Sequence, residues 1–376
     1  MKEKLTIRDF GPIKDMSFEF KKINILIGDQ GTGKSTVAKL LSAIKNSISL
    51  ELFDLPKNKT EQFYGHLDLV GIKNYIKKES ILIYTYDNFL FELKDGKVSI
   101  NKEMTLEESM YFSYNYVPAE RIMVSALADS LYALLEVKAE LPKLFLRFGN
   151  KYQSSRKKET QFDYKDILGI SFTHRDNKDY ILLADGNEIT LTDASSGIQG
   201  CVPLLTVVDS IMSESISSGK IKTLIDKNWR LLVIEEVELN CFPETQNKLI
   251  KYIIDKNTIR SIQTIDLDGN YLEKNDLIKN QLVITTHSPY ILTSLNNLMY
   301  AFSVGKNHYE EVDKIVESKY WINPNDVSAY MLLPNGICEN ILDYEQNMIK
   351  AEKIDEVSSF LNQQFDALLN IELVKK

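Results

Sequence analysis

The amino-acid sequence predicts an α/β protein with a mixed central sheet flanked by helices, an antiparallel β part and a helical lobe. Three segments, residues 23–27, 230–234 and 281–285, are mostly apolar, which is typical of strands buried on both faces. Near the N-terminus, by contrast, apolar and polar residues alternate from Met16 to Phe20, as in a strand with one exposed face. Segments with helical spacing follow the buried strands and can cover the sheet.

Length, composition and charge limit the class of protein. A chain of 376 residues exceeds one typical domain of ~100–200 residues, so we expect one large domain with insertions or two lobes. The 44% hydrophobic and 26% charged residues fit a folded chain and exclude disorder as the main state. Because the net charge is −8, the surface as a whole does not attract nucleic acid or an anionic membrane.

No targeting or membrane segment is predicted. The longest apolar run, from Cys201 to Met212, contains Asp209 and is shorter than the ~20 apolar residues that span a bilayer. No apolar stretch of the kind found in secretory signals follows the charged N-terminus. Cys201, Cys241 and Cys338 lie far apart in the sequence, so neither a disulfide framework nor a zinc site is indicated. We therefore expect a cytoplasmic protein without membrane contact.

The remaining pattern predicts the other elements. Residues 4–8 and 16–20 are expected to form two strands around a turn at Gly11-Pro12, and residues 80–86 and 89–93 a hairpin. Residues 259–280 are polar and are expected to form an inserted loop or hairpin. Further strands are expected at 114–117, 170–173, 180–183 and 188–191, and helices at 75–79, 122–158, 194–212, 243–254 and 348–369.

A glycine-rich segment between the first buried strand and a helix predicts a phosphate-binding loop. Residues 28–35 fit the pattern G-x-x-x-x-G-K-[ST]. The glycines let backbone N–H groups face phosphate oxygens, Lys34 reaches the β- and γ-phosphates, and the Ser35 hydroxyl is suited to Mg²⁺. A glycine-rich turn without a ligand is disfavoured, because the strand, the lysine, the hydroxyls and the helix occur together. The candidate nucleotide-binding residues are Gly28, Asp29, Gln30, Gly31, Thr32, Gly33, Lys34, Ser35 and Thr36.

Two adjacent carboxylates, Glu235 and Glu236, end the second buried strand. Like charges in a partly desolvated site repel each other, but a divalent cation reverses that argument. Glu235 can hold Mg²⁺, directly or through water, and Glu236 can orient or deprotonate an attacking water. A solvated strand end is the alternative. The ends of parallel strands are where ligands bind in open α/β sheets.

Two further segments carry candidate ligand-binding residues. His287 follows the third buried strand, and although a lone histidine there is more often structural, the neighbouring motifs suit its imidazole to a γ-phosphate. Residues 195–199, Ser-Ser-Gly-Ile-Gln, precede a helix. They are either an ordinary helix start or a second phosphate cradle made of a hydroxyl, backbone N–H groups and the helix dipole. The candidates in this second segment are Ser196, Gly197 and Gln199.

In order and type, these motifs resemble the ABC-type ATPases of the SMC-like and OLD-like group, and in particular compact bacterial ATPases of anti-phage systems. The ATPase subunits of Septu, retron-associated and PARIS-like systems are of this kind. The resemblance covers roughly residues 1–305 and implies a P-loop NTPase fold of ABC/SMC-head type. It is carried by Phe10-Gly11-Pro12-Ile13-Lys14, Tyr116-Val117-Pro118-Ala119-Glu120-Arg121, Glu235-Glu236-Val237-Glu238, and Thr286-His287-Ser288-Pro289-Tyr290-Ile291-Leu292.

The resemblance implies a homodimer, or a higher oligomer, in which two ATP molecules lie between head-to-tail subunits. The catalytic residues would be Glu236, His287 and Lys34, and the metal ligands Ser35 and Glu235. Ser196 and Gly197 would come from the opposite chain. Three positions depart from the family pattern: Glu235 stands where Asp is commoner, Ile198 replaces a glycine, and no Q-loop glutamine follows Val117, so that Glu120 or Arg121 is expected there.

These motifs divide the chain into four expected parts. Residues 1–120 are an N-terminal ATPase lobe, and residues 121–195 a helical and β insertion lobe. Residues 196–305 are a C-terminal ATPase lobe, and residues 306–376 an α/β extension. The 89 residues after His287 lack the acidic spacing of a TOPRIM nuclease, so the ATPase is expected to need a separate effector protein.

Three functions remain open from the sequence. The first is an ATP-driven sensor or regulator in an anti-phage defence complex whose effector is a separate nuclease or toxin. The second is a RecF- or SMC-like ATPase of DNA repair or chromosome maintenance. The third, a nucleotide-binding subunit of an ABC transporter, is disfavoured by the atypical signature. The basic stretch Lys143, Arg147, Lys151, Arg156, Lys157 and Lys158 leaves contact with nucleic acid open, with a solvated helical face as the alternative.

Overall fold

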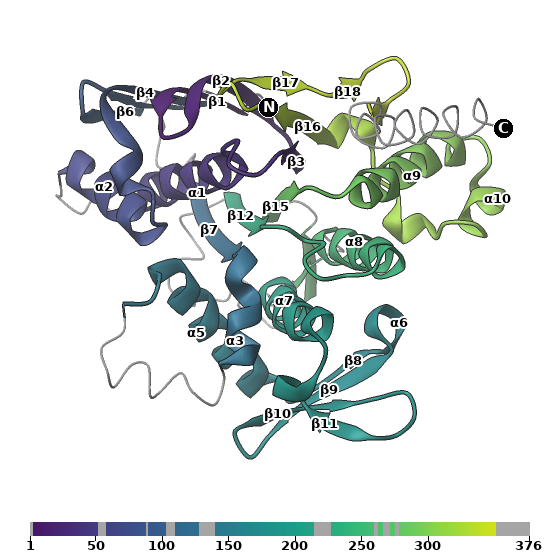
Figure 1. Ribbon diagram of the computed structural model, residues 1–376. Coiled ribbons are helices and arrows are strands. Elements are labelled where there is room, and N and C mark those ends of the chain that lie inside the picture. Colours follow the sequence, from purple (N-terminus) through teal and green to yellow (C-terminus); the bar gives the residue numbers. More distant parts are fainter. Residues whose placement is uncertain are drawn as a thin grey trace, which may run out of the picture.

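The protein is described by a computed structural model (Figure 1). It describes residues 3–51, 58–87, 89–102, 110–127, 140–213, 227–258, 262–265, 271–274 and 278–350. Within these residues no helix is both long enough and apolar enough to cross a membrane.

A six-stranded sheet forms the centre of the fold, in the order β17-β16-β3-β15-β12-β7. Its five strands β16, β3, β15, β12 and β7 are parallel, and only the edge strand β17 is antiparallel. Because parallel strands end at the same edge, the loops after β3, β12 and β15 are brought together. The strands are β3 (Ile23–Gly28), β7 (Met110–Val117), β12 (Lys227–Ile234), β15 (Ile278–Thr286), β16 (Val327–Leu332) and β17 (Cys338–Asn340).

One buried amide fixes β3 between its two neighbours. The Asn24 side chain lies in the core, where its carbonyl oxygen accepts hydrogen bonds from the Lys21 N–H and the Ser328 hydroxyl, both at 2.7 Å. Its amide group donates to the carbonyl oxygens of Lys21 and Leu282, at 2.8 and 3.0 Å. Since a buried amide without partners is costly, this arrangement favours one register of β3 against β15 and β16.

A second, antiparallel sheet lies on one side of the central sheet, with α1 (Lys34–Glu51) packed between the two (Figure 1). Apolar side chains of both sheets and of α1 form one continuous buried cluster, which includes Leu5, Val37 and Val283. The strand order is β2-β1-β4-β5-β6. The helix α2 spans Lys59–Leu69. The strands of this sheet are β1 (Glu3–Phe10), β2 (Ile13–Phe20), β4 (Ile76–Tyr86), β5 (Phe89–Lys94) and β6 (Lys97–Lys102).

Helices cover the opposite face of the central sheet. Leu204, Ile250 and Leu295, from three different helices, pack with Ile25 and Leu232 of the sheet in a second buried cluster. These helices are α7 (Ser196–Ser213), α8 (Pro243–Asn257) and α9 (Pro289–Gly305). Beyond them lie α3 (Ile122–Ala126), α5 (Lys143–Lys158), α6 (Lys165–Leu168) and a small antiparallel sheet of β8 (Gln161–Tyr164), β9 (Ile170–Arg175), β10 (Lys178–Leu182) and β11 (Glu188–Thr190).

The predicted α/β fold with a mixed sheet, an antiparallel β part and flanking helices is confirmed. The predicted helix at 75–79 is wrong, because β4 begins at Ile76, which pairs with Phe10 of β1, and after an irregularity pairs with β1 again from Ile81 to Tyr86. The predicted helix at 122–158 is found as α3 and α5, with residues 128–139 outside the described part. The remaining elements are β13 (Ile262–Ile265), β14 (Tyr271–Lys274), α10 (Tyr309–Asp313), β18 (Leu342–Asp343), β19 (Met348–Ile349) and the short 3₁₀ turns Lys73–Tyr75, Ala119–Arg121, Leu191–Asp193, Ser318–Tyr320 and Pro324–Asp326.

The C-terminal part of the chain takes a place that the sequence pattern does not indicate. The predicted helix at 348–369 is wrong at its start, where β19 pairs with β18, and residues 351–376 lie outside the described part. Before it, β16 pairs with β3 inside the central sheet. The strand that carries the glycine-rich loop therefore has a neighbour from the segment that the sequence suggested to be an extension.

Candidate functional site

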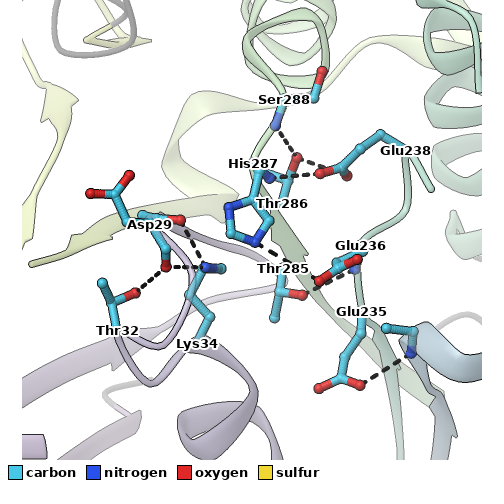
Figure 2. A network of polar contacts seen from close by, with 12 residues as sticks. Asp29, Thr32, Lys34, Glu235, Glu236, Glu238, Thr285, Thr286, His287 and Ser288 are labelled. Atoms are coloured by element: carbon cyan, nitrogen blue, oxygen red, sulfur yellow. Dashed lines mark hydrogen bonds and ion pairs between the residues drawn. The ribbon is translucent and has the colours of Figure 1, made fainter. Parts of the chain in front are cut away.

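The glycine-rich loop connects β3 to α1 and closes over the Lys34 side chain. The Lys34 ammonium donates hydrogen bonds to the carbonyl oxygens of Gly28 and Asp29, both at 2.7 Å. The Thr32 hydroxyl donates to the same Asp29 carbonyl at 2.8 Å (Figure 2). The first helical hydrogen bond of α1 runs from the Val37 N–H to the Gly33 carbonyl. The lysine is thus held across the loop at the start of a helix, as the predicted phosphate cradle requires.

Two glycines of this loop are required by its geometry. At Gly28 a Cβ atom would lie 2.2 Å from the Leu332 carbonyl oxygen of β16, a distance that no side chain can accept. Gly33 has a φ of +100°, in the left-handed region that L-residues rarely adopt. The other candidates surround them: Gln30, Gly31 and Ser35 are exposed, while Thr36 is buried.

The charge of Lys34 stands in a partly dry, negatively charged site. Desolvation lowers the pKa of its ammonium from the usual range, and the carboxylates of Glu236, Asp29 and Glu238 oppose that shift. The ammonium has lost much of its hydration, and its contacts are backbone carbonyls rather than a direct ion pair. An anionic oxygen placed beside it would therefore be bound strongly.

Glu235 is brought to the end of β12, but its carboxylate points away from Lys34 (Figure 2). It is buried, and its two oxygens accept hydrogen bonds from the Tyr116 hydroxyl at 2.8 Å and the Ala119 N–H at 3.2 Å. Burial and the charge of Glu235 raise the pKa of Tyr116 well above its usual value, so the phenol remains a donor. The side chain anchors the end of β7 to β12.

Glu236 has a strained backbone that several contacts hold. Its φ is +43°, a conformation that costs a non-glycine residue about 1–3 kcal/mol. Its N–H donates to the Thr285 hydroxyl at 3.1 Å, and its carbonyl accepts from the Arg121 guanidinium at 2.7 Å. The side chain is directed to the loop after β15, with a carboxylate oxygen 3.9 Å from the His287 Nε2 (Figure 2). Strain that is maintained in this way is typical of functional sites.

Glu238 holds His287, a role that the sequence analysis did not assign to it. Its carboxylate accepts hydrogen bonds from the Thr286 hydroxyl at 2.9 Å and the His287 N–H at 2.6 Å. The Thr286 hydroxyl in turn accepts from the Ser288 N–H at 3.0 Å. The backbone at His287 is therefore fixed by the loop that carries Glu236. In the sequence, this role could have been found from the third glutamate of Glu-Glu-Val-Glu, because that glutamate lies in neither a helix nor a strand.

Arg121 joins the segments around the two glutamates. Its guanidinium is completely buried and donates to the carbonyl oxygens of Glu235 and Glu236, each at 2.7 Å. It also donates to the carbonyls of Pro118 and Gly200, each at 3.3 Å. With these four backbone acceptors the side chain is a structural link, which disfavours Arg121 as the one of the two candidates, Glu120 or Arg121, that takes the place of a Q-loop glutamine. Glu120 is exposed.

Ser196 and Gly197 lie at the start of α7 and not beside the glycine-rich loop of the same chain. The main described helix contacts of α7 are with α3, α5 and α8, and in Figure 1 the helix lies apart from the loop between β3 and α1. Ser196 is exposed, and a Cβ atom at Gly197 would lie 2.7 Å from the Asn240 carbonyl oxygen. The Gln199 amide donates to the carbonyls of Thr192 and Ala194, at 2.7 and 2.9 Å, and so closes the preceding turn.

The residues present fit Mg²⁺ only in part. Ser35 is exposed on the first turn of α1 and can offer its hydroxyl. Both oxygens of Glu235 are engaged by protein donors, so direct coordination by that residue would require a rearrangement. Among the described residues, no three His, Cys, Asp or Glu side chains are grouped as metal ligands. Mg²⁺ keeps several waters and takes substrate phosphates as ligands, which agrees with so small a protein contribution.

Comparison with known proteins identifies the family. The family described as AAA ATPase domain matches residues 1–181 and 130–292. The chain belongs to this family. Its members are ATPases, so the match supports the P-loop ATPase class and nucleotide binding. It does not assign the chain to the anti-phage subgroup. A comparison with curated proteins gave no match.

Several solved structures are similar to this chain. The SMC head domain from Thermotoga maritima is 10% identical, with a TM-score of 0.38, 90% of this chain covered and 98% of that one. The recombination mediator protein RecF with ATPrS is 11% identical, with a TM-score of 0.41 and coverage of 91% and 98%. RecF with ATP is 11% identical, with a TM-score of 0.39 and coverage of 90% and 99%.

Replacing Lys34 by alanine should weaken ATP binding. A charged contact in a partly dry site contributes about 1.5–3 kcal/mol, so calorimetry should show a Kd increased by about 10- to 100-fold. Lys39→Ala, on the same helix and half-buried, is the matched control and should leave the Kd unchanged. Equal ATP affinity of Lys34→Ala and the unchanged protein would contradict the assignment of residues 28–35 as the phosphate-binding loop.

Proposed function

We propose that this protein binds and hydrolyses ATP as an ABC-type ATPase, and that it acts as a sensor or regulator in a bacterial anti-phage defence complex. The effector, a nuclease or toxin, is a separate protein. One observation carries the ATPase part of this proposal: Lys34, Glu236 and His287 come from the ends of three adjacent parallel strands and face one another (Figure 2).

Each of these residues has a distinct part in the proposed reaction. The backbone N–H groups of the loop and Lys34 hold the β- and γ-phosphates in place. The Glu236 carboxylate accepts a proton from the attacking water, and the nearby His287 imidazole contacts the γ-phosphate oxygens. Mg²⁺, when bound with the nucleotide, would neutralise phosphate charge; Ser35 would hold it, and Glu235 would contribute through water.

The exposed start of α7 supports a dimer in which each subunit completes the other's site. Ser196 lies at the N-terminus of an 18-residue helix, whose dipole favours an anion at this end. α7 packs against other helices and the central sheet of its own chain, and it lies apart from the loop between β3 and α1 (Figure 1). A phosphate bound at Ser196 and Gly197 would therefore belong to an ATP held by a partner subunit.

The contacts of α5 bear on the alternative, a RecF- or SMC-like ATPase that acts on DNA. Its basic side chains could form a phosphate-binding surface, but three of them are engaged within the fold. Lys143 forms an ion pair with Asp68, Arg156 is buried against Asp179, and Arg147 donates to the Tyr114 hydroxyl. These contacts favour a structural role for much of this stretch, and the motif resemblance favours the defence role.

Glu236→Gln tests the reaction. The amide keeps the size of the side chain but cannot accept the proton, so ATP should bind while hydrolysis falls by about a hundredfold or more. Steady-state phosphate release measures the rate, and nucleotide trapping should show an ATP-bound dimer. Glu235→Gln is the control, with a smaller loss. Wild-type hydrolysis by Glu236→Gln together with an inactive Glu235→Gln would mean that the two roles are reversed.

Mixing two inactive variants tests the dimer. Lys34→Ala has a defective phosphate loop, and Ser196→Arg fills the space of the opposing γ-phosphate, so each variant alone should hydrolyse almost no ATP. In the mixed dimer one site joins the intact loop of one chain to the intact Ser196 of the other, and activity should return. Mixed dimers that form with ATP but show neither hydrolysis nor nucleotide trapped at a single site would contradict the shared site.

Phage challenge tests the defence role. Cells that express the protein with its neighbouring genes should lower the plating efficiency of phage, and Lys34→Ala and Glu236→Gln should abolish that protection because both remove the ATP cycle. Lys39→Ala, expressed to the same level, should still protect. Absence of protection against a broad phage panel, together with sensitivity to DNA damage when the gene is deleted, would instead favour the repair ATPase.

A further inference from the structure

Two cysteines that lie 40 positions apart in the sequence meet next to the candidate site. The Sγ atoms of Cys201 and Cys241 are 3.1 Å apart. Cys201 belongs to the second turn of α7, and Cys241 to the loop between Glu236 and α8. The sequence does not predict this contact, because it contains no paired cysteine motif and the two residues meet only through the packing of α7 against that loop.

The surroundings give the two thiols different properties. Cys201 is completely buried, whereas Cys241 is partly exposed, so an oxidant in solution reaches Cys241 first. The hydrogen bond with Cys201 lowers the pKa of the Cys241 thiol, and the nearby Arg121 guanidinium acts in the same direction. The same hydrogen bond, and then burial, raise the pKa of Cys201. Cys241 is thus the reactive member of the pair, and Cys201 is placed to resolve it.

We infer that Cys201 and Cys241 form an oxidation site, at which a peroxide converts the pair into a reversible disulfide between α7 and the loop after β12. The contact distance of 3.1 Å must shorten to about 2.05 Å, the length of a disulfide, and so requires little movement of either segment.

The chemistry balances with one molecule of hydrogen peroxide. The Cys241 thiolate attacks one peroxide oxygen, the O–O bond breaks, and hydroxide leaves, which gives a sulfenic acid. The Cys201 sulfur then attacks the Cys241 sulfur and the sulfenic oxygen leaves as water, after taking up the Cys201 proton. Two thiols have lost two electrons in all, and the peroxide has been reduced to water. A thiol reductant reverses the step by exchange.

The disulfide would join two segments whose relative position matters for the proposed reaction. The Cys201 segment begins with Ser196 and Gly197, and the Cys241 loop carries Glu236 and Glu238. The Asn240 carbonyl already approaches Gly197 closely, so a covalent link would remove what freedom remains between them. Resting on the proposed function, we expect the oxidised protein to hydrolyse ATP more slowly, because the loop and the start of α7 could no longer adjust separately to a partner subunit.

Peptide mapping tests the site without any assay of activity. The purified full-length protein is treated with hydrogen peroxide, blocked with an alkylating agent and digested without reductant. We expect a linked peptide that contains Cys201 and Cys241 and disappears after dithiothreitol. Cys338→Ala, which removes the third cysteine on β17, is the control and should give the same linked peptide. Cys241 recovered as sulfinic or sulfonic acid, with no link to Cys201, would overturn the inference.

ATP hydrolysis by the oxidised protein tests the consequence. The rate should fall about fivefold or more, a typical size for coupling between sites, and should return with dithiothreitol. Cys201→Ala cannot form the disulfide and should hydrolyse ATP, with or without peroxide, at the rate of the original protein before oxidation. Cys241→Ala replaces it if the buried substitution prevents folding. A fully linked protein with an unchanged rate would refute the effect on turnover. If the reduced protein hydrolyses no ATP, the proposed function fails, and the peptide map still decides the disulfide.

Discussion

The buried guanidinium of Arg121 is the interaction on which the arrangement of the site depends. Burying a charge without partners is costly, and here the cost is offset by hydrogen bonds to four backbone carbonyls. Those carbonyls belong to the end of β7, the end of β12 and the first turns of α7. Only a planar group with several donors can serve them all at once, which a lysine ammonium could not do. One side chain therefore holds both the backbone of Glu236, which is proposed to activate the attacking water, and the start of α7.

Around this link, the site is positioned mostly through the backbone. Glu236 keeps an unfavourable φ because its N–H and carbonyl both have fixed partners, and His287 keeps its place because Glu238 binds its N–H. The side chains proposed to react, by contrast, make few contacts of their own. A rigid frame with free functional groups limits the reorganisation that binding of a polyanion would require, which is how electrostatic preorganisation lowers a barrier.

Much of this site could be predicted from the sequence, because its parts are local. A strand, a glycine-rich turn and a helix start lie within residues 23–41, and the glutamate pair and His287 each follow a short apolar run. The features of the site that could not be predicted depend on contacts between residues that are distant in the sequence. The direction of the Glu235 carboxylate is decided by Tyr116, the role of Glu238 by Thr286 and the pairing of Cys201 by the path of the loop at Cys241. No local pattern encodes such partners, and the start of β4 at Ile76 is followed by three exposed charged residues, so no alternation of apolar and polar residues marks it.

The place of β16 beside β3 has a consequence for how the chain reaches its final form. During synthesis, β1 to β3 and the glycine-rich loop leave the ribosome early, but the strand that closes one side of β3 comes some 300 residues later. Contacts between such distant segments form slowly, because a long loop must first be closed. Until then the apolar edge of β3 is unpaired, and an unpaired edge is open to wrong partners. A nascent chain of this kind would benefit from a chaperone until its last strand arrives.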